Sequence, residues 1–195
     1  MKKIIFLFII IFSFQTLQLT AKNRLRFNTS LSSTVNQYKN EKTSFSFDSG
    51  YSNSAKGNSL YLILNSSLGL GYTKSEVTSD ADAGGKLTLE SNTYNISFLL
   101  GDDDLNYQLG LNITGETKVS ELSASGVDFS GFYDYDTDIC RNYFLNFGTN
   151  INESVELLFG ISSWEVATDV NFNGLNLAKY SSNYNLYNVG IGILF

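Results

Sequence analysis

Three carboxylates, Asp134, Asp136 and Asp138, stand at alternate positions of this sequence. Carboxylates with this spacing begin a calcium-binding loop, in which their oxygen atoms bind the ion. Here Ile139 stands where such a loop needs glycine, and Leu145 stands where it needs a bidentate glutamate. The motif is incomplete, so we expect either a loosely held divalent cation or a solvated surface loop.

Histidine, the side chain that most often serves as a general base, does not occur among the 195 residues. The single cysteine, Cys140, has no second thiol with which to form a disulfide. We therefore expect no catalytic residue, no cofactor and no enzymatic activity, with catalysis by carboxylates alone as the alternative.

Other polar side chains recur at every second position of segments that are apolar at the positions between. In a β-strand such positions share one face. This polar face comprises Arg24, Arg26, Glu116, Asn142, Asn146 and Glu156. If the strands close into a narrow barrel, these side chains face its lumen, where charges require partners. We expect an ion pair between the two arginines and Glu156, which fills the lumen or, alternatively, gates it for ions.

Aromatic side chains gather in one segment that is otherwise hydrophilic. These are Phe129, Phe132, Tyr133 and Tyr135, within residues 118–138. Apolar groups on a hydrophilic surface can mark a site where a partner binds. We interpret them as candidates for surface interaction, with local packing or extension of the strands above the membrane as the alternative.

The segments that position these side chains are predicted to be β-strands, because Leu, Phe and Tyr alternate with Asn, Gln, Ser and Gly. Eight are expected, over residues 24–35, 43–51, 60–72, 86–100, 105–117, 139–148, 154–166 and 184–195. The absence of proline suits a chain that lies mostly in hydrogen-bonded strands. The predicted fold class is all-β, an eight-stranded antiparallel up-and-down transmembrane β-barrel.

Two details of these strands are also predicted. Leu87 and Leu89 are out of phase with Tyr94 and Ile96, which indicates a β-bulge near Ser91. An aromatic girdle is expected from Tyr72, Tyr94, Tyr107, Tyr143, Trp164, Tyr184 and Tyr187.

Connections between the strands alternate in length. Residues 53–58, 101–104 and 149–153 are short, whereas residues 73–85, 118–138 and 167–183 are longer, with 36–42 a short first loop. Bacterial barrels keep short turns in the periplasm and longer loops outside. This pattern predicts that both termini of the barrel lie in the periplasm.

The N-terminus has the layout of a secretory signal peptide. Lys2 and Lys3 precede an apolar run over residues 4–14, and Ala21 offers a small residue for cleavage. We predict a signal peptide over residues 1–21 and a barrel domain over residues 22–195. The net charge of −6 argues against nucleic acid as a partner.

The last strand carries Tyr187, Val189, Ile191, Ile193 and the terminal Phe195 on one face. With this ending and the Leu, Gly and Phe alternation, the chain resembles the small eight-stranded outer-membrane barrels of OmpA, OmpX and opacity type. The resemblance implies the outer membrane of a diderm bacterium. It also implies contact with outer-membrane lipids and lipopolysaccharide, and recognition of the five residues by the barrel-assembly machinery.

Three functions follow as hypotheses. The first is a non-enzymatic outer-membrane scaffold whose surface loops serve adhesion or another surface interaction, with a ligand that is unknown. Outer-membrane barrel enzymes employ a histidine, which this chain lacks. The second is a narrow pore or conduit for small solutes, as in OmpW-like proteins. The third is a secreted soluble binding barrel of lipocalin type, which would turn its apolar faces inward.

Overall fold

Strands extend through most of the described chain. The computed structural model describes residues 22–195 except 48, 49, 65, 66 and 103, so the predicted signal peptide lies outside the described residues. The elements are β1 (Arg24–Asn40), β2 (Phe45–Ser46), β3 (Tyr51–Ile63), β4 (Leu68–Ala81), β5 (Gly85–Gly101), β6 (Leu105–Ala124), β7 (Val127–Asp128), the 3-10 helix η1 (Ser130–Phe132), β8 (Asp134–Asn152), β9 (Val155–Phe172) and β10 (Leu175–Leu194).

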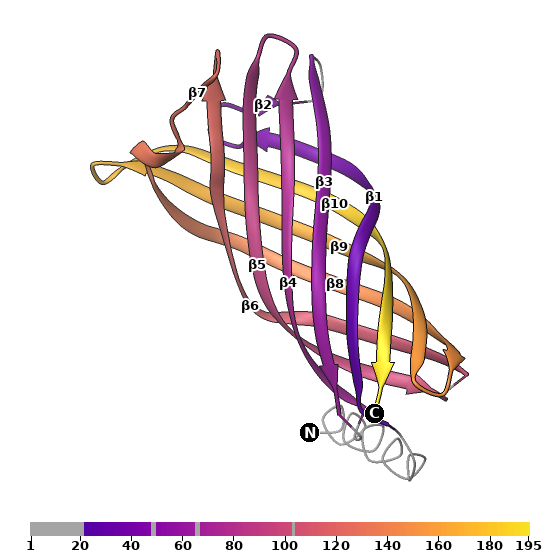
Figure 1. Cartoon of the computed structure of the whole chain (residues 1–195). Helices are drawn as coiled ribbons and strands as arrows, with labels where there is room; N and C mark the ends of the chain where they lie inside the picture. Colours follow the sequence, from indigo (N-terminus) through magenta and orange to yellow (C-terminus); the bar gives the residue numbers. More distant parts are fainter. Residues whose placement is uncertain (1–21, 48–49, 65–66, 103) are drawn as a thin grey trace.

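Antiparallel pairing joins the long strands into a closed ring. The order is β1, β3, β4, β5, β6, β8, β9 and β10, and β10 pairs back onto β1 through Arg24 opposite Leu194. The short β2 and β7 pair only with β1 and β6 (Figure 1). The predicted eight-stranded antiparallel up-and-down barrel is confirmed. In the described part of the chain, no helix is long and apolar enough to cross a membrane.

The boundaries of the first strands differ from the prediction. Residues 60–72 are two strands, β3 and β4, joined by a turn in which Ser67 N–H donates to the carbonyl of Leu64 at 2.9 Å. The predicted strand over residues 43–51 is reduced to β2 and the start of β3. Outward leucines have even residue numbers on both sides of the turn. Alternation at every second residue therefore continues through the turn and does not reveal that the chain reverses direction there.

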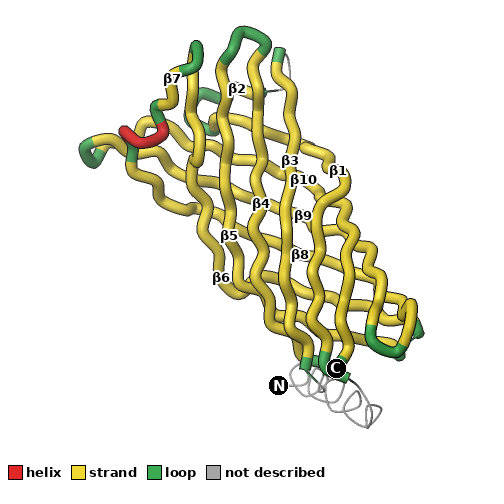
Figure 2. The backbone as a smooth tube through the Cα atoms, in the orientation of Figure 1, coloured by secondary structure: helices red, strands yellow, loops and turns green. Residues whose placement is uncertain are grey.

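The long outer loops are also shorter than predicted. Strands continue through most of residues 73–85, 118–138 and 167–183, and turns remain only near the strand tips (Figure 2). Asn173 and Gly174 form one such turn with φ of 52° and 76°, the conformation that an Asn-Gly hairpin turn requires. These polar segments therefore extend the wall of the barrel.

The half of the barrel near the termini is apolar outside and polar inside. We call the exposed apolar side chains on its outer wall the apolar belt. Its members include Leu25, Phe27, Leu60, Leu62, Leu70, Leu109, Leu111, Phe159, Ile191 and Ile193, and Tyr72, Tyr94, Tyr143 and Tyr187 lie at its upper edge. This distribution suits contact with lipid.

The half of the barrel far from the termini, which is the upper half in Figure 1, is apolar inside and charged outside. Its interior is an apolar core formed by Tyr38, Val77, Leu87, Leu89, Val119, Trp164, Val166, Val170, Ala178, Tyr184 and Leu186. Its outer wall carries ion pairs, among them Lys86 with Glu121 at 2.6 Å and Arg141 with Glu165 at 2.9 Å. An apolar interior and a charged exterior are the arrangement of a protein in water, so this half suits a position above the lipid.

Two predicted details are corrected by this core. Leu87 and Leu89 point inward in the same phase as Ser91, so no bulge interrupts β5 there. The register shifts lie instead on the neighbouring strand β6. Trp164 and Tyr184, which were predicted for the girdle, lie in the core with stacked rings whose centroids are 5.9 Å apart.

Two interruptions divide the wall of the upper half. Ladder pairing between β1 and β3 stops at Thr29 opposite Asn58, and pairing between β6 and β8 stops at Leu111 opposite Tyr143. Above these points β3 to β6 stand nearly upright, while β8 to β10 and the upper part of β1 cross behind them at an angle (Figure 1). The upper half is therefore two sheets packed on the shared apolar core.

Candidate functional site

A network of charged and amide side chains occupies the lower lumen. Arg24 Nη1 donates to Glu156 Oε2 at 2.8 Å, and Arg26 Nε donates to Glu156 Oε1 at 2.7 Å. Arg26 also donates to Gln108 Oε1 at 3.1 Å and to Asn106 Oδ1. The predicted ion pair is present, because β1 and β9 flank β10 and direct all three charged side chains inward.

The lumen is filled at this level and above it. Asn146 Nδ2 donates to Gln108 Oε1 at 3.3 Å, and Asn142 is also fully buried. At the boundary between the network and the apolar core, a cavity bordered by Tyr61 and Phe144 has a volume of about 10 Å³. A cavity of this size holds about one water molecule.

Glu116 is a correction to the predicted lumen set, because its side chain is exposed on the outer wall. The register shift that leaves Ile113 without a partner on β5 reverses the phase of β6 above it. Asn106 and Gln108 therefore point inward below the shift, whereas Thr117 points inward above it. A single unpaired residue thus moves Glu116 from the lumen to the outside.

The alternating carboxylates are dispersed at the rim. Asp138 lies 2.6 Å from Lys179, and Asp136 accepts a hydrogen bond from Asn171 Nδ2 at 2.7 Å. Asp134 is exposed. Among the described residues, no group of three or more carboxylates or thiols is arranged to hold a metal ion.

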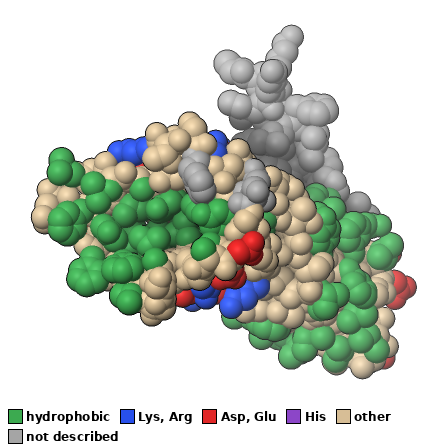
Figure 3. All heavy atoms as spheres, turned by 90° about the horizontal axis from the view of Figure 1, so that it is seen from above, with side chains coloured by type: hydrophobic (Ala, Val, Ile, Leu, Met, Phe, Trp, Pro, Cys, Tyr) green, Lys and Arg blue, Asp and Glu red, His purple; other side chains and the backbone are tan. Residues whose placement is uncertain are grey.

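The loop aromatics do come together. Phe129, Phe132 and Tyr133 line an open apolar groove of about 340 Å³ with Phe172 and Leu177 from the β9–β10 hairpin. We call it the rim groove. Hydrophobic side chains gather on the left of Figure 3, over the end of the molecule where η1 and this hairpin lie. Tyr135 instead packs against the apolar core, and its hydroxyl donates to the Ser130 carbonyl at 2.6 Å.

Two contacts fix the shape of the rim groove. The rings of Tyr133 and Phe172 meet edge to face with centroids 6.1 Å apart. Asp128 accepts hydrogen bonds from Ser130, at 2.9 Å from the backbone N–H and 3.0 Å from the hydroxyl, and so holds the turn that presents Phe132. These bonds, from the backbone N–H first, lower the pKa of Asp128 below its usual 3.8.

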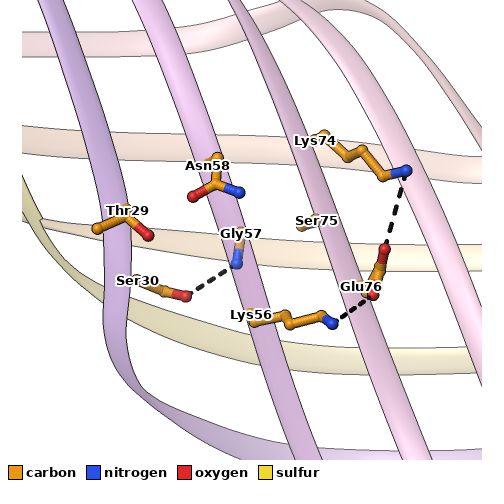
Figure 4. Close-up of a pocket in the computed structure, with 8 residues that line it drawn as sticks. All are labelled: Thr29, Ser30, Lys56, Gly57, Asn58, Lys74, Ser75 and Glu76. Atoms are coloured by element: carbon orange, nitrogen blue, oxygen red, sulfur yellow. Dashed lines mark hydrogen bonds and ion pairs between the residues drawn. The ribbon is translucent and has the colours of Figure 1, made fainter.

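A second pocket lies on the outer wall, and sequence reasoning missed it. It occupies about 320 Å³ beside the point where β1 and β3 separate, and we call it the wall pocket (Figure 4). Its residues are Thr29, Ser30, Lys56, Gly57, Asn58, Lys74, Ser75 and Glu76. The predicted boundaries assigned several of these residues to connections, which concealed their common position.

The predicted assembly signal lies on the outer face of β10. Tyr187, Ile191, Ile193 and Phe195 are exposed, and Val189 is half-buried in the same phase. Gly192 and Leu194 face inward, and Gly192 packs against Glu156.

Comparison with known proteins agrees at the level of the fold. No protein-family model and no curated protein matches the sequence. Among solved structures, Neisserial surface protein A matches with a TM-score of 0.56 and 11% identity, over 89% of this chain and 97% of that chain. The outer membrane protein OprG from Pseudomonas aeruginosa matches with a TM-score of 0.51 and 11% identity, over 90% and 96%.

The matches and the geometry point to the same class of protein. Both solved structures align with nearly the whole described chain, and the apolar belt agrees with the predicted outer-membrane location. The chain has the fold of a small eight-stranded outer-membrane β-barrel.

Proposed function

We propose that this protein is a closed, non-enzymatic outer-membrane scaffold that binds a protein partner at the rim groove. The observation that carries the proposal is the convergence of Phe129, Phe132 and Tyr133 with Phe172 and Leu177 at the end of the barrel farthest from the termini. Phe132 is 68% exposed, and it belongs to a contiguous apolar patch with four other side chains, the kind of surface that marks an interaction site.

The charges around the rim groove specify the kind of partner. Asp128, Asp134 and Asp136 are exposed on the same rim. Two lysines also lie there: Lys179 is 2.6 Å from Asp138, and Lys42 Nζ donates to the Asn176 carbonyl in the β9–β10 hairpin. An acidic border around an apolar groove favours a segment whose apolar side chains are flanked by lysine or arginine. We therefore expect the partner to present a basic amphipathic segment.

The filled lumen supports a scaffold in preference to a pore. Arg26, Asn106 and Gln108 are fully buried in the lower half, and the apolar core occupies the interior above them. An eight-stranded barrel is just wide enough for side chains to fill. In planar bilayers we expect no stepwise conductance from the wild-type protein, and regular single-channel steps would support the pore instead.

Peptide binding to the purified protein in detergent micelles tests the proposal. The probes are a synthetic amphipathic Lys-Leu peptide and its Glu-Leu counterpart. We expect the Lys-Leu peptide to bind, and Phe132→Ala with Leu177→Ala to weaken it about tenfold, because two apolar contacts are lost. Ile151→Ala serves as the matched control, since Ile151 is 63% exposed in the β8–β9 turn region at the other end.

Calorimetric titration distinguishes the outcomes. Equal affinity for the two peptides would mean that the acidic border has no role. Unchanged affinity of the double variant would place binding on the micelle or on another surface, and would contradict the proposal.

A further inference from the structure

The wall pocket exists because the ladder between β1 and β3 stops. Above Thr29 and Asn58 the two strands are joined by side chains, as Gly57 N–H donates to Ser30 Oγ at 2.9 Å and Ala55 N–H donates to Ser33 Oγ at 3.0 Å. The separation leaves a polar recess that exposes hydroxyl, amide and backbone groups. Figure 4 shows the side chains of Lys56 and Lys74 turned toward Glu76, away from Thr29 and Ser30 on β1.

The recess lies directly above the apolar belt on three adjacent strands. Outward positions alternate, so Phe27 is followed on the outer face by Thr29, Leu60 by Asn58, and Tyr72 by Lys74. Two residues along a strand correspond to about 7 Å. The wall pocket therefore stands at the height where lipid headgroups meet the protein.

Two ammonium groups are held at this height. Lys56 Nζ lies 3.0 Å from Glu76 Oε2, and Lys74 Nζ lies 3.8 Å from Glu76 Oε1. Lys74 also donates to Glu90 at 2.7 Å. An ammonium has three donors, so each lysine retains capacity to bind a further acceptor.

We propose that the wall pocket binds the phosphorylated sugar headgroup of an outer-leaflet glycolipid. Lys56 and Lys74 donate to a phosphate, and Glu76 holds the two ammonium groups in place before the lipid arrives. Thr29, Ser30 and Asn58 offer hydroxyl and amide groups that match sugar hydroxyls. The acyl chains then lie along the apolar belt immediately below, where Phe27, Leu60 and Tyr72 are exposed.

Two outward lysines lie away from this site, whereas Lys118 lies in the same cross-strand row as Lys56, with Nζ 3.8 Å from Glu90 Oε1. Lys86 is also on the wall and lies 2.6 Å from Glu121, but it stands near the upper end of β5, next to Gly85. Lys39 near the end of β1 lies 3.7 Å from Glu41. Neither lysine belongs to the wall pocket. These two residues provide a control of equal charge.

The test measures lipid binding to the purified protein in detergent micelles by native mass spectrometry and titration. The probes are bisphosphorylated lipid A, dephosphorylated lipid A and inorganic phosphate. We expect bisphosphorylated lipid A to bind the wild type, and Lys56→Gln with Lys74→Gln to weaken it about tenfold through loss of two charge-assisted bonds. Lys39→Gln with Lys86→Gln leaves the affinity unchanged. All four replaced side chains are on the outer wall. Folding of each variant is verified by the heat-dependent electrophoretic shift, the difference in migration between unboiled and boiled samples.

Three results would overturn the proposal. Equal affinity of the two double variants for lipid A would show that the wall pocket is not the site. Equal binding of phosphorylated and dephosphorylated lipid A would remove the role of the phosphate. Binding of inorganic phosphate as tight as that of lipid A, with the same loss in the pocket variant, would assign the site to a free anion.

Discussion

The guanidinium of Arg26 lies against both carboxylate oxygens of Glu156, with Nε 2.7 Å from Oε1 and Nη2 2.7 Å from Oε2. Both side chains are fully buried, and Arg24 approaches the same carboxylate at 2.8 Å. One carboxylate thus serves two buried cations, and this relationship makes the lower barrel sensitive to a single substitution.

Glu156→Ala is expected to lower the free energy of unfolding by about 3 to 5 kcal/mol, because it leaves two buried guanidinium groups without their carboxylate. Urea unfolding in micelles, followed by the heat-dependent electrophoretic shift, measures the loss. Glu165→Ala breaks the exposed pair with Arg141 and should cost under about 1 kcal/mol. Similar losses for the two variants would contradict the structural role of the network.

Gly110→Ala tests the packing of the lumen. A Cβ at Gly110 would overlap the ring of Phe144 and lie 2.8 Å from the carbonyl oxygen of Ile96. We expect a loss of about 1 to 3 kcal/mol from overpacking, measured by the same unfolding assay. Gly131→Ala is the matched control, because a Cβ there meets nothing within 4 Å, and it should leave stability unchanged.

Trp164→Ala should loosen the upper half in particular. Trp164 stacks on Tyr184 with a 4° angle between the ring planes, and both are buried in the apolar core. Removal of the indole should cost about 3 to 5 kcal/mol and leave a cavity between the two sheets. We expect faster hydrogen exchange in the upper parts of β9 and β10, with the lower parts protected as before. Phe132→Ala, at an exposed rim position, should not change this exchange; uniform acceleration along both strands would refute the division of the barrel.

Acidification should release the turn that presents Phe132. Since the pKa of Asp128 is lowered by the Ser130 backbone N–H first and then by its hydroxyl, the carboxylate stabilises the turn above its usual pKa of 3.8. That contribution is lost as pH falls through the lowered pKa. Affinity of the Lys-Leu peptide for the rim groove should decline over this range. Asp128→Asn keeps an oxygen that accepts from the Ser130 backbone N–H, loses the acceptor for the Ser130 hydroxyl and does not titrate. Its affinity should therefore decline less as pH falls, and a parallel decline would assign the effect to other groups.

Much of the fold was predictable because side chains at every second position of a strand lie on the same face, so the two faces appear as an alternation of residue types. The clear alternation in β6 predicted the outward leucines and the inward amides. The inward phases of β1 and β9, which flank β10, predicted the ion pair of Arg26 with Glu156. The same rule failed at Glu116, because one unpaired residue at Ile113 reverses the phase without leaving a mark in the sequence. It also failed at residues 60–72, where both strands of a hairpin share one parity.

Residues 73–85, 118–138 and 167–183 of the upper half were interpreted as loops because their polar residues look like surface segments. Val77 and Val119 are buried inside, while Glu76 and Lys118 form ion pairs on the outer wall, so the alternation continues there with its polarity reversed. Leu87 and Leu89, within the predicted strand over residues 86–100, follow the same reversed pattern. Where a strand passes from lipid into water, its outward side chains change from apolar to polar, and its inward side chains change from polar to apolar. The expected bulge near Ser91 was a misinterpretation of this exchange.

The sequence by itself determined the class of protein, the number of strands and the buried ion pair, since these follow from alternation along each strand and from the order of strands around a ring. Only the tertiary structure decided where the wall opens and which distant side chains meet. The rim groove joins residues 129–133 to Phe172 and Leu177, and the wall pocket joins β1 to β3 and β4. Which distant side chains meet depends on strand register and on where ladder pairing stops. Neither can be predicted from local residue patterns.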